Sequence, residues 1–145
     1  MIPVIHTQHP AITHGKYRIA ASPRALPGYA GLVPADISQQ ALLNVVSRPH
    51  AWADWFEQNS LQHRAMRMGP GFELTAHLIQ AAVAGIGIGL VPRILVQDEI
   101  DSGELVALFE PVDSGRSYYL TYATRYQHLP ALQAFSQWLL DFAAT

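Results

Sequence analysis

Segments with the pattern of strands alternate with segments with the pattern of amphipathic helices along this chain. Short runs of aliphatic and β-branched residues indicate strands, and apolar residues three and four positions apart indicate helices. The expected strands cover residues 2–5, 17–20, 41–46, 66–72, 86–91, 105–109 and 118–122, and the expected helical segments begin near residues 34, 52, 74, 92 and 130. This alternation predicts an α/β fold with a mixed sheet, in a single domain of 145 residues.

Aromatic residues at helical spacing mark two of these helices. Trp52, Trp55 and Phe56 follow an i, i+3, i+4 pattern, which predicts a face that packs on the core, in a helix that Asn59 ends. The last helix carries Phe135 and Trp138 on a similar apolar stripe. It needs another surface to pack against.

The run Gly85-Ile-Gly-Ile-Gly89 has the composition of a phosphate-binding loop. Such a loop follows a strand and opens a helix, so that the helix N-terminus faces the phosphate. Here the glycines follow a helix and enter a strand. We therefore expect Gly85 to end the helix and Gly87 and Gly89 to allow close backbone packing, with no nucleotide cofactor.

The charge pattern gives little support for contact with DNA. Charged residues make up 14% of the chain, the formal net charge is −2, and the basic residues are scattered. A nucleic-acid interface concentrates Lys and Arg on one face. The chain lacks a secretory signal pattern and an apolar run long enough to span a bilayer, which predicts a cytoplasmic domain. It also lacks cysteine, which excludes disulfides and leaves the redox compartment undetermined.

No constellation of residues indicates catalysis or metal binding. The seven histidines lack a His-Glu-x-x-His motif, and the pair His6 and His9 would point to opposite sides of a strand and turn. There is no Gly-x-Ser-x-Gly motif, and the segment 113–116 (Asp-Ser-Gly-Arg) is typical of a turn. We expect neither an enzyme nor a metal site nor a cofactor.

The best candidate for a binding site is the segment 69–75, where a strand leads into a helix. A helix N-terminus exposes unpaired N–H groups and the positive end of the helix dipole, which attract anions. We expect four residues to line a small-molecule pocket: Phe72, Glu73, Leu74 and Thr75. In the alternative interpretation Glu73 or Thr75 only caps the helix and Phe72 packs in the core. Glu73 would repel an anionic ligand unless its side chain points away.

Several segments, in order along the chain, resemble the sensor domain of LysR-type transcriptional regulators. They are Ile2–Val4, Leu42–Leu43, Arg48–Phe56 with its Trp-x-x-Trp-Phe motif, Ile79–Arg93, Asp101–Val106, Tyr118–Tyr122 and Pro130–Leu139. The Trp-x-x-Trp-Phe motif is similar to the subgroup of the glycine-cleavage-system regulator. The resemblance covers nearly the whole chain.

The resemblance implies a fold like that of a type II periplasmic binding protein, in which a small-molecule effector binds between two α/β lobes. Residues 1–145 would then be a partial effector-binding domain: mostly the second lobe, plus the C-terminal helix of the first. DNA would be bound only through an N-terminal winged helix-turn-helix that is absent here. The resemblance implies that six residues bind effector: Thr7, His9, Phe72, Glu73, Leu74 and Thr75.

The same resemblance implies that the C-terminal helix loses its usual packing surface, so we expect a homodimer or a rearrangement.

Two other functions are alternatives to the sensor. A transport-type solute-binding protein of similar fold would require a signal peptide. An enzyme on the same scaffold would require a convergent set of catalytic groups, and fold alone does not supply one.

Overall fold

The structure, a computed structural model, describes residues 12–143, and the chain divides into two compact units. The central unit is Lys16–Val112, and the terminal unit combines the segment that ends at Gly15 with the segment that begins at Asp113. The last helix thus belongs to a different unit from the other α-helices. The strand expected at residues 2–5 lies outside the described residues.

A mixed sheet forms the centre of the fold. In the described part of the chain the strands are β1 (Thr13–Ala21), β2 (Ala41–Val45), β3 (Arg67–Phe72), β4 (Ile88–Pro92), β5 (Val106–Ala107) and β6 (Val112–Tyr118). Their order is β3-β2-β4-β1-β5, and β6 pairs with β1. β2 runs parallel to β3 and β4, whereas β1 runs antiparallel to β4 and β5. The predicted mixed sheet is confirmed.

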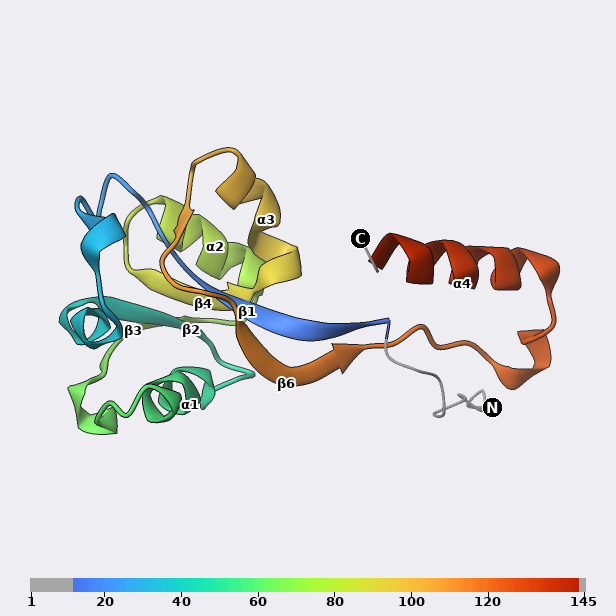
Figure 1. The fold of residues 1–145 in the computed structure, drawn as a ribbon. Coiled ribbons are helices and arrows are strands. Elements are labelled where there is room, and N and C mark those ends of the chain that lie inside the picture. Colours follow the sequence, from blue (N-terminus) through green and yellow to red (C-terminus); the bar gives the residue numbers. More distant parts are fainter. Residues whose placement is uncertain (1–11, 144–145) are drawn as a thin grey trace. The chain divides into compact units, whose positions relative to one another are not determined.

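The predicted helices are also present. The α-helices are α1 (Ala51–Gln58), α2 (Thr75–Val83), α3 (Arg93–Asp101) and α4 (Pro130–Ala143), and the 3-10 helices are η1 (Tyr29–Gly31), η2 (Pro34–Gln39), η3 (His63–Ala65) and η4 (Thr124–Tyr126). In the central unit α1 covers one face of the sheet, and α2 and α3 cover the other (Figure 1). No helix in residues 12–143 is long and apolar enough to cross a membrane.

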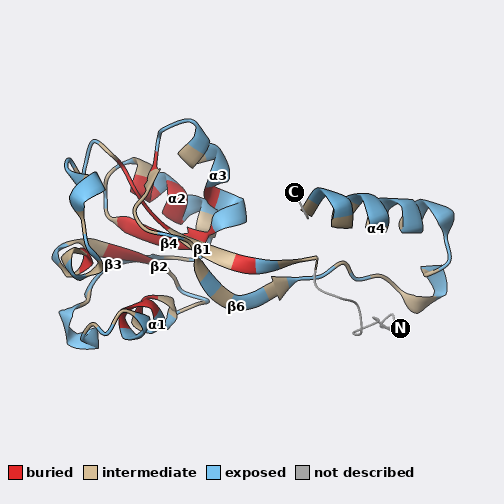
Figure 2. Cartoon of the chain, viewed as in Figure 1, coloured by how far each residue is buried: buried red, intermediate tan, exposed pale blue. Residues whose placement is uncertain are grey.

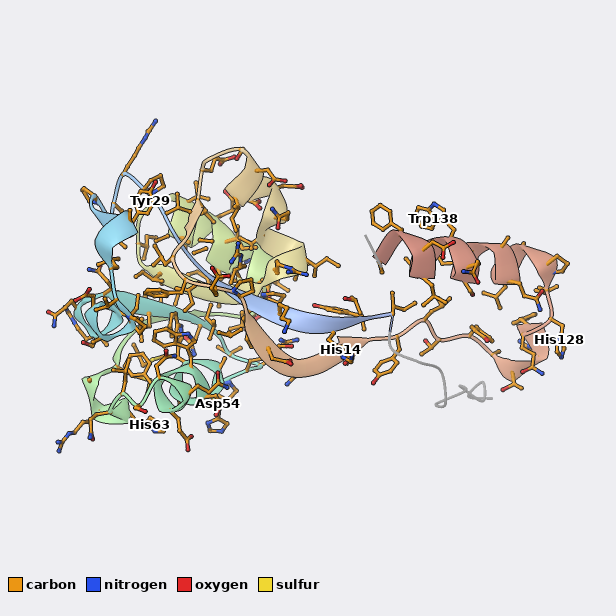
Figure 3. The ribbon with its side chains drawn as sticks, viewed as in Figure 1. His14, Tyr29, Asp54, His63, His128 and Trp138 are labelled. Carbon is orange, nitrogen blue, oxygen red and sulfur yellow. The ribbon has the colours of Figure 1, made fainter. Side chains whose placement is uncertain are left out.

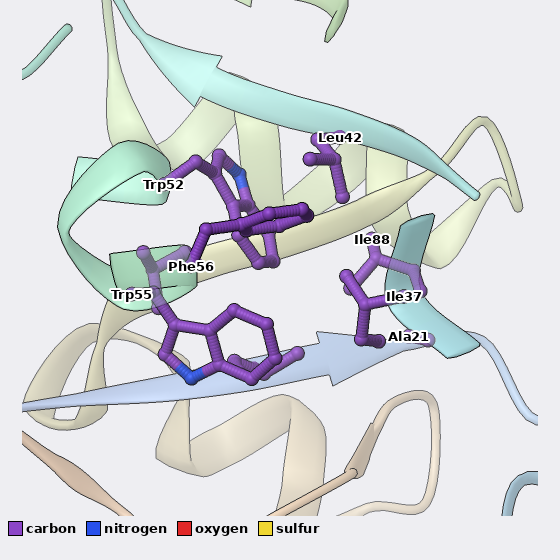
Figure 4. Packing of buried hydrophobic residues seen from close by; sticks show 9 residues of the cluster. Ala21, Ile37, Leu42, Trp52, Trp55, Phe56 and Ile88 are labelled. Carbon is purple, nitrogen blue, oxygen red and sulfur yellow. The ribbon is translucent and has the colours of Figure 1, made fainter. Parts of the chain in front are cut away.

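The aromatic stripe of α1 forms the core on its face of the sheet. Trp52, Trp55 and Phe56 are at most 3% exposed and pack with Leu42 and Ile88 (Figure 4). The three rings meet edge to face, with centroids 5.6–6.4 Å apart, which is a favoured aromatic geometry. The predicted core-facing role of this stripe is confirmed.

A second core lies on the opposite face of the sheet, under α2 and α3. Leu78 of α2 and Val96 of α3 are completely buried there, with Leu43 and Val91 from the strands. Figure 2 shows buried segments on α2 and α3. Successive strand residues point to opposite faces, so Leu42 enters the α1 core while Leu43 enters this one. The continuous apolar runs of β2 and β4 follow from this burial on both faces.

The glycine run has the structural role expected from its sequence context. Gly85 has φ +82° directly after α2, and the N–H groups of Gly85 and Ile86 donate to the carbonyls of Ala82 and Ala81. This is a Schellman C-cap, which favours glycine. A Cβ on Gly87 would lie 2.5 Å from the carbonyl oxygen of Ala41 in β2. The run is therefore a helix stop and a close-packing site.

The strand expected at 66–72 contains a Gly-Pro-Gly sequence, and its pairing is irregular there. The register of β3 against β2 shifts between Leu42 and Asn44, because Met68 pairs with Leu42 and Gly71 pairs with Asn44. β3 therefore continues through its Gly-Pro-Gly sequence with one extra residue. The strand expected at 105–109 is shorter than predicted, since β5 holds two residues.

Two expectations for the terminal unit are wrong. The segment 113–116 was expected to form a turn but lies inside β6, which pairs with β1. One hydrogen bond typical of a turn is still present, from the Gly115 N–H to Asp113 Oδ1. The strand expected at 118–122 ends at its first residue, Tyr118. Aromatic and β-branched residues made 118–122 resemble a strand, but pairing with β1 places the strand earlier in the chain.

Candidate functional site

The candidate site is a recess of the central unit at the carboxyl ends of β2 and β4. It is a small recess of about 20 Å³ that is partly open to solvent. Its lining consists of Tyr17, Leu43, Asn44, Val45, Arg48, Ala51, Trp52, Thr75, Leu90 and Pro92. β2 and β4 are adjacent and parallel, and the helices that follow them lie on opposite faces of the sheet (Figure 1). Open α/β sheets bind ligands at such a switch point, just beyond the carboxyl ends of the strands.

Arg48 supplies the positive charge of the recess. It lies in the turn between β2 and α1, where its N–H donates to the Val45 carbonyl at 2.9 Å. Its Nη1 donates to the hydroxyl of Tyr17 at 2.7 Å, and its guanidinium lies 5.8 Å from the centre of the Tyr17 ring. An arginine has five N–H donors, so this arrangement orients the guanidinium and leaves donors for a ligand.

Trp52 forms part of the apolar wall of the recess. Its indole Nε1 donates to the Leu43 carbonyl at 2.8 Å, and its ring is 2% exposed. This bond fixes the first turn of α1 against β2. Arg48, three residues before the start of α1, is therefore connected on both sides to rigid elements.

The first turn of α2 contributes Thr75 to the recess. The N-cap residue is Leu74, which provides no side-chain hydrogen bond to the helix. The alternative in which Glu73 or Thr75 caps the helix is therefore wrong for these residues, because neither occupies the N-cap position. The N–H groups of this turn carry the positive end of the helix dipole.

The structure separates the residues that the sequence grouped as a pocket. Thr75 lines the recess, whereas Glu73 and Leu74 are exposed and lie outside its lining. Phe72 ends β3 and packs, partly buried, against the core under α2, as the alternative interpretation expected. Thr7 and His9 lie outside the described residues.

Sequence reasoning missed Arg48, Tyr17 and Asn44 as site residues. Arg48 and Asn44 come at the carboxyl end of a buried strand, which is a signal that could have identified them. Tyr17 could not be found in this way, because it reaches the recess from β1, where it pairs with Pro92 across the sheet.

The lining contains one cation and no acid. The lining also includes the polar residues Tyr17, Thr75 and Asn44, and the remaining lining residues are apolar. Such a lining suits the anionic group of a ligand, held at Arg48. In residues 12–143 no group of three or more His, Asp or Glu side chains is arranged to hold a metal ion.

Comparisons of the sequence with family models and with known proteins indicate the same family. The family model described as the LysR substrate binding domain matches residues 8–144. The chain is 36% identical over 114 residues to the HTH-type transcriptional regulator TrpI of Pseudomonas aeruginosa, covering 79% of this chain and 38% of that protein. It is 35% identical over 125 residues to the glycine cleavage system transcriptional activator of Escherichia coli, covering 85% and 41%.

A solved structure supports the same fold. The effector domain of the transcriptional regulator AmpR of Pseudomonas aeruginosa superposes with a TM-score of 0.72 at 27% identity, covering 93% of this chain and 63% of that one. LysR effector domains have a fold like that of type II periplasmic binding proteins. The chain spans about two-fifths of the length of the curated relatives it matches. Its sequence and its fold agree, and the chain belongs to the LysR substrate binding domain family.

Proposed function

We propose that this chain senses a small-molecule effector on behalf of a LysR-type transcriptional regulator. The observation that carries the proposal is the recess at the carboxyl ends of β2 and β4, with Arg48 positioned by Tyr17. A ligand that binds one conformation of the regulator better than another shifts the population towards it. Sensing therefore needs only a site of this kind and no catalytic group. We accordingly propose that the chain is not an enzyme.

The effector carries an anionic group, a carboxylate or a phosphate. Arg48 is the charged residue of the lining, and the first turn of α2 adds its dipole on the same side as Thr75. Repulsion by Glu73 does not oppose this assignment, because Glu73 is exposed and outside the lining. We propose that a larger effector also contacts residues at the rim of the recess: Phe72, Glu73 and Leu74.

Residues 1–145 are part of an effector-binding domain, and they supply one side of the interlobe cleft. The relatives that the chain resembles are more than twice its length. We assign DNA binding in the intact regulator to a winged helix-turn-helix outside these residues, since the basic residues here are scattered. Thr7 and His9 remain proposed cleft residues. A regulator of this kind acts in the cytoplasm.

The test is a titration of the isotopically labelled chain with acetate and with inorganic phosphate, followed by amide NMR shifts. We expect saturable shifts at Arg48 and Thr75. Arg48→Gln should weaken binding about tenfold or more, because a charge-assisted hydrogen bond is lost. Arg64→Gln, at an exposed arginine of η3, is the matched control and should bind as the unchanged chain does.

Equal affinity of Arg48→Gln and Arg64→Gln would refute the anion site. Thr75→Ala separates the contribution of the helix start. Unchanged affinity together with unchanged stability would remove Thr75 both from the site and from any structural role in α2.

We further propose that the chain forms a homodimer through α4. No residue of α4 is buried in the structure (Figure 2). Phe135, Trp138 and Phe142 are 48–64% exposed, and Figure 3 shows Trp138 on this helix. The rings of Trp138 and Phe142 stack with centroids 5.4 Å apart, and those of Phe135 and Trp138 are tilted with centroids 5.9 Å apart. An aromatic stripe of this kind is a strong candidate for an interface.

A further inference from the structure

A second recess lies on the α2–α3 face of the central unit. It has a volume of about 180 Å³ and is partly open to solvent, and its lining is Ala76, Ile79, Gln80, Leu95 and Glu99. It shares no lining residue with the Arg48 recess. Helix α2 nevertheless contributes to both, since Thr75 lines one and Ala76 lines the other.

The recess lies between α2 and α3. Ala76, Ile79 and Gln80 share one face of α2, and Leu95 and Glu99 are one turn apart on α3. Val96, next to Leu95, is completely buried in the core below, whereas Leu95 itself is 54% exposed. Within the central unit, Leu95 thus presents exposed aliphatic surface beside the buried Ile79.

Glu99 is the charged group of this recess and is incompletely paired. Its Oε2 is shielded from solvent and has no hydrogen-bond partner. The neighbouring donors of α3 are used elsewhere: Ser102 Oγ donates to the Glu99 backbone carbonyl, and Gln97 Nε2 donates to Asp101. A shielded carboxylate oxygen without a donor is unfavourable. A ligand that brings a donor, above all a cationic one, would relieve this cost.

The charges around the recess favour a cation over an anion. α3 carries Asp98, Glu99 and Asp101 in its second half, with Arg93 at its far, N-terminal end. The positive end of the α2 dipole lies at Ala76, in the first turn of that helix. Both α2 and α3 leave the carboxyl ends of parallel strands, so they run in the same direction. A positive group is therefore favoured at the Gln80–Glu99 end, away from Ala76.

We propose that this recess binds a primary organic ammonium with a short aliphatic chain. The ammonium donates to Glu99 Oε2 and to the side-chain carbonyl of Gln80. The aliphatic chain lies along Ile79 and Leu95 towards Ala76. This ligand differs in charge from the anion assigned to the Arg48 recess, so the two sites take different molecules.

The experiment titrates the labelled chain with n-butylammonium chloride, with n-butanol and sodium chloride as the neutral and ionic controls. We expect saturable amide shifts at Ala76, Gln80 and Glu99 with the ammonium, and at least tenfold weaker binding of butanol. Glu99→Gln keeps the shape and removes the charge, and should weaken ammonium binding about tenfold or more. Asp98→Asn removes a charge from the same helix outside the recess and should preserve binding within about twofold.

A second variant tests the cavity separately from the charge. Ala76→Leu fills the recess and retains Glu99, and it should abolish the shifts at Gln80 and Glu99 while the chain remains folded. Equal ammonium affinity in Glu99→Gln and Asp98→Asn, equal binding of butanol, or shifts that map to other residues would each overturn the proposal. Anion binding is followed by the amide shifts of Arg48 and Thr75, whereas ammonium binding is followed by those of Ala76, Gln80 and Glu99. Failure of one site is therefore distinguishable from failure of the other.

Discussion

Phe56 offers the sharpest test of the core that supports the Arg48 recess. Its side chain is 0% exposed and meets Trp52 and Trp55 edge to face at 6.4 and 5.6 Å. Phe56→Leu keeps most of the volume, at a cost of up to about 1.5 kcal/mol, and loses two aromatic pairs of about 0.5–1.5 kcal/mol each. We expect a loss of about 2–3 kcal/mol in the free energy of unfolding. Phe56→Ala adds a cavity and should cost about 3–5 kcal/mol.

The assay is urea unfolding followed by tryptophan fluorescence. Trp52 and Trp55 report the central unit, whereas Trp138 lies in the terminal unit, so all variants carry Trp138→Phe. Val46→Ala, at a residue 55% exposed, is the control and should change stability by less than about 0.5 kcal/mol. A loss below about 1 kcal/mol for Phe56→Ala would refute the conclusion that this aromatic cluster holds α1 on the sheet.

Two more predictions concern the end of α2 and the surface of α4. Gly85→Ala should destabilise the chain by about 1–2 kcal/mol in the same assay, because φ is +82° there. The control Gly31→Ala, where a Cβ would have no atom within 4 Å, should leave stability nearly unchanged. Equal losses of stability in the two variants would contradict the assignment of a Schellman cap at Gly85. Sedimentation should show a concentration-dependent dimer that Trp138→Glu dissociates and that Gln137→Glu, with the same charge on an exposed polar site, preserves. A chain that stays monomeric at high concentration would refute the α4 interface.

Local sequence patterns correctly predicted those features that depend on a single helix or its end. The spacing of Trp52, Trp55 and Phe56 predicted the buried face of α1, because a helix repeats every 3.6 residues whatever it packs against. The context of Gly85 predicted a helix stop for a similar reason, since the Schellman cap involves only neighbouring backbone groups.

The candidate site was predicted only in part. Thr75 follows from the general property that helix N-termini attract ligands, and it lines the recess. Phe72, Glu73 and Leu74 were grouped with it because they are adjacent in sequence. The strand-to-helix turn sends their side chains in different directions, so Phe72 enters the core while Glu73 and Leu74 face solvent.

The sequence by itself determined the alternation of strands and helices, the mixed α/β class, the aromatic face of α1 and the function of the glycine run. Only the tertiary structure decided which strand ends meet. Tyr17 and Arg48 lie 31 positions apart and touch because β1 is placed beside β4, and β4 beside β2. It also decided that 113–116 belongs to a strand, because pairing with β1 outweighs a local turn preference. Strand pairing joins residues distant along the chain, and no local pattern encodes the partner.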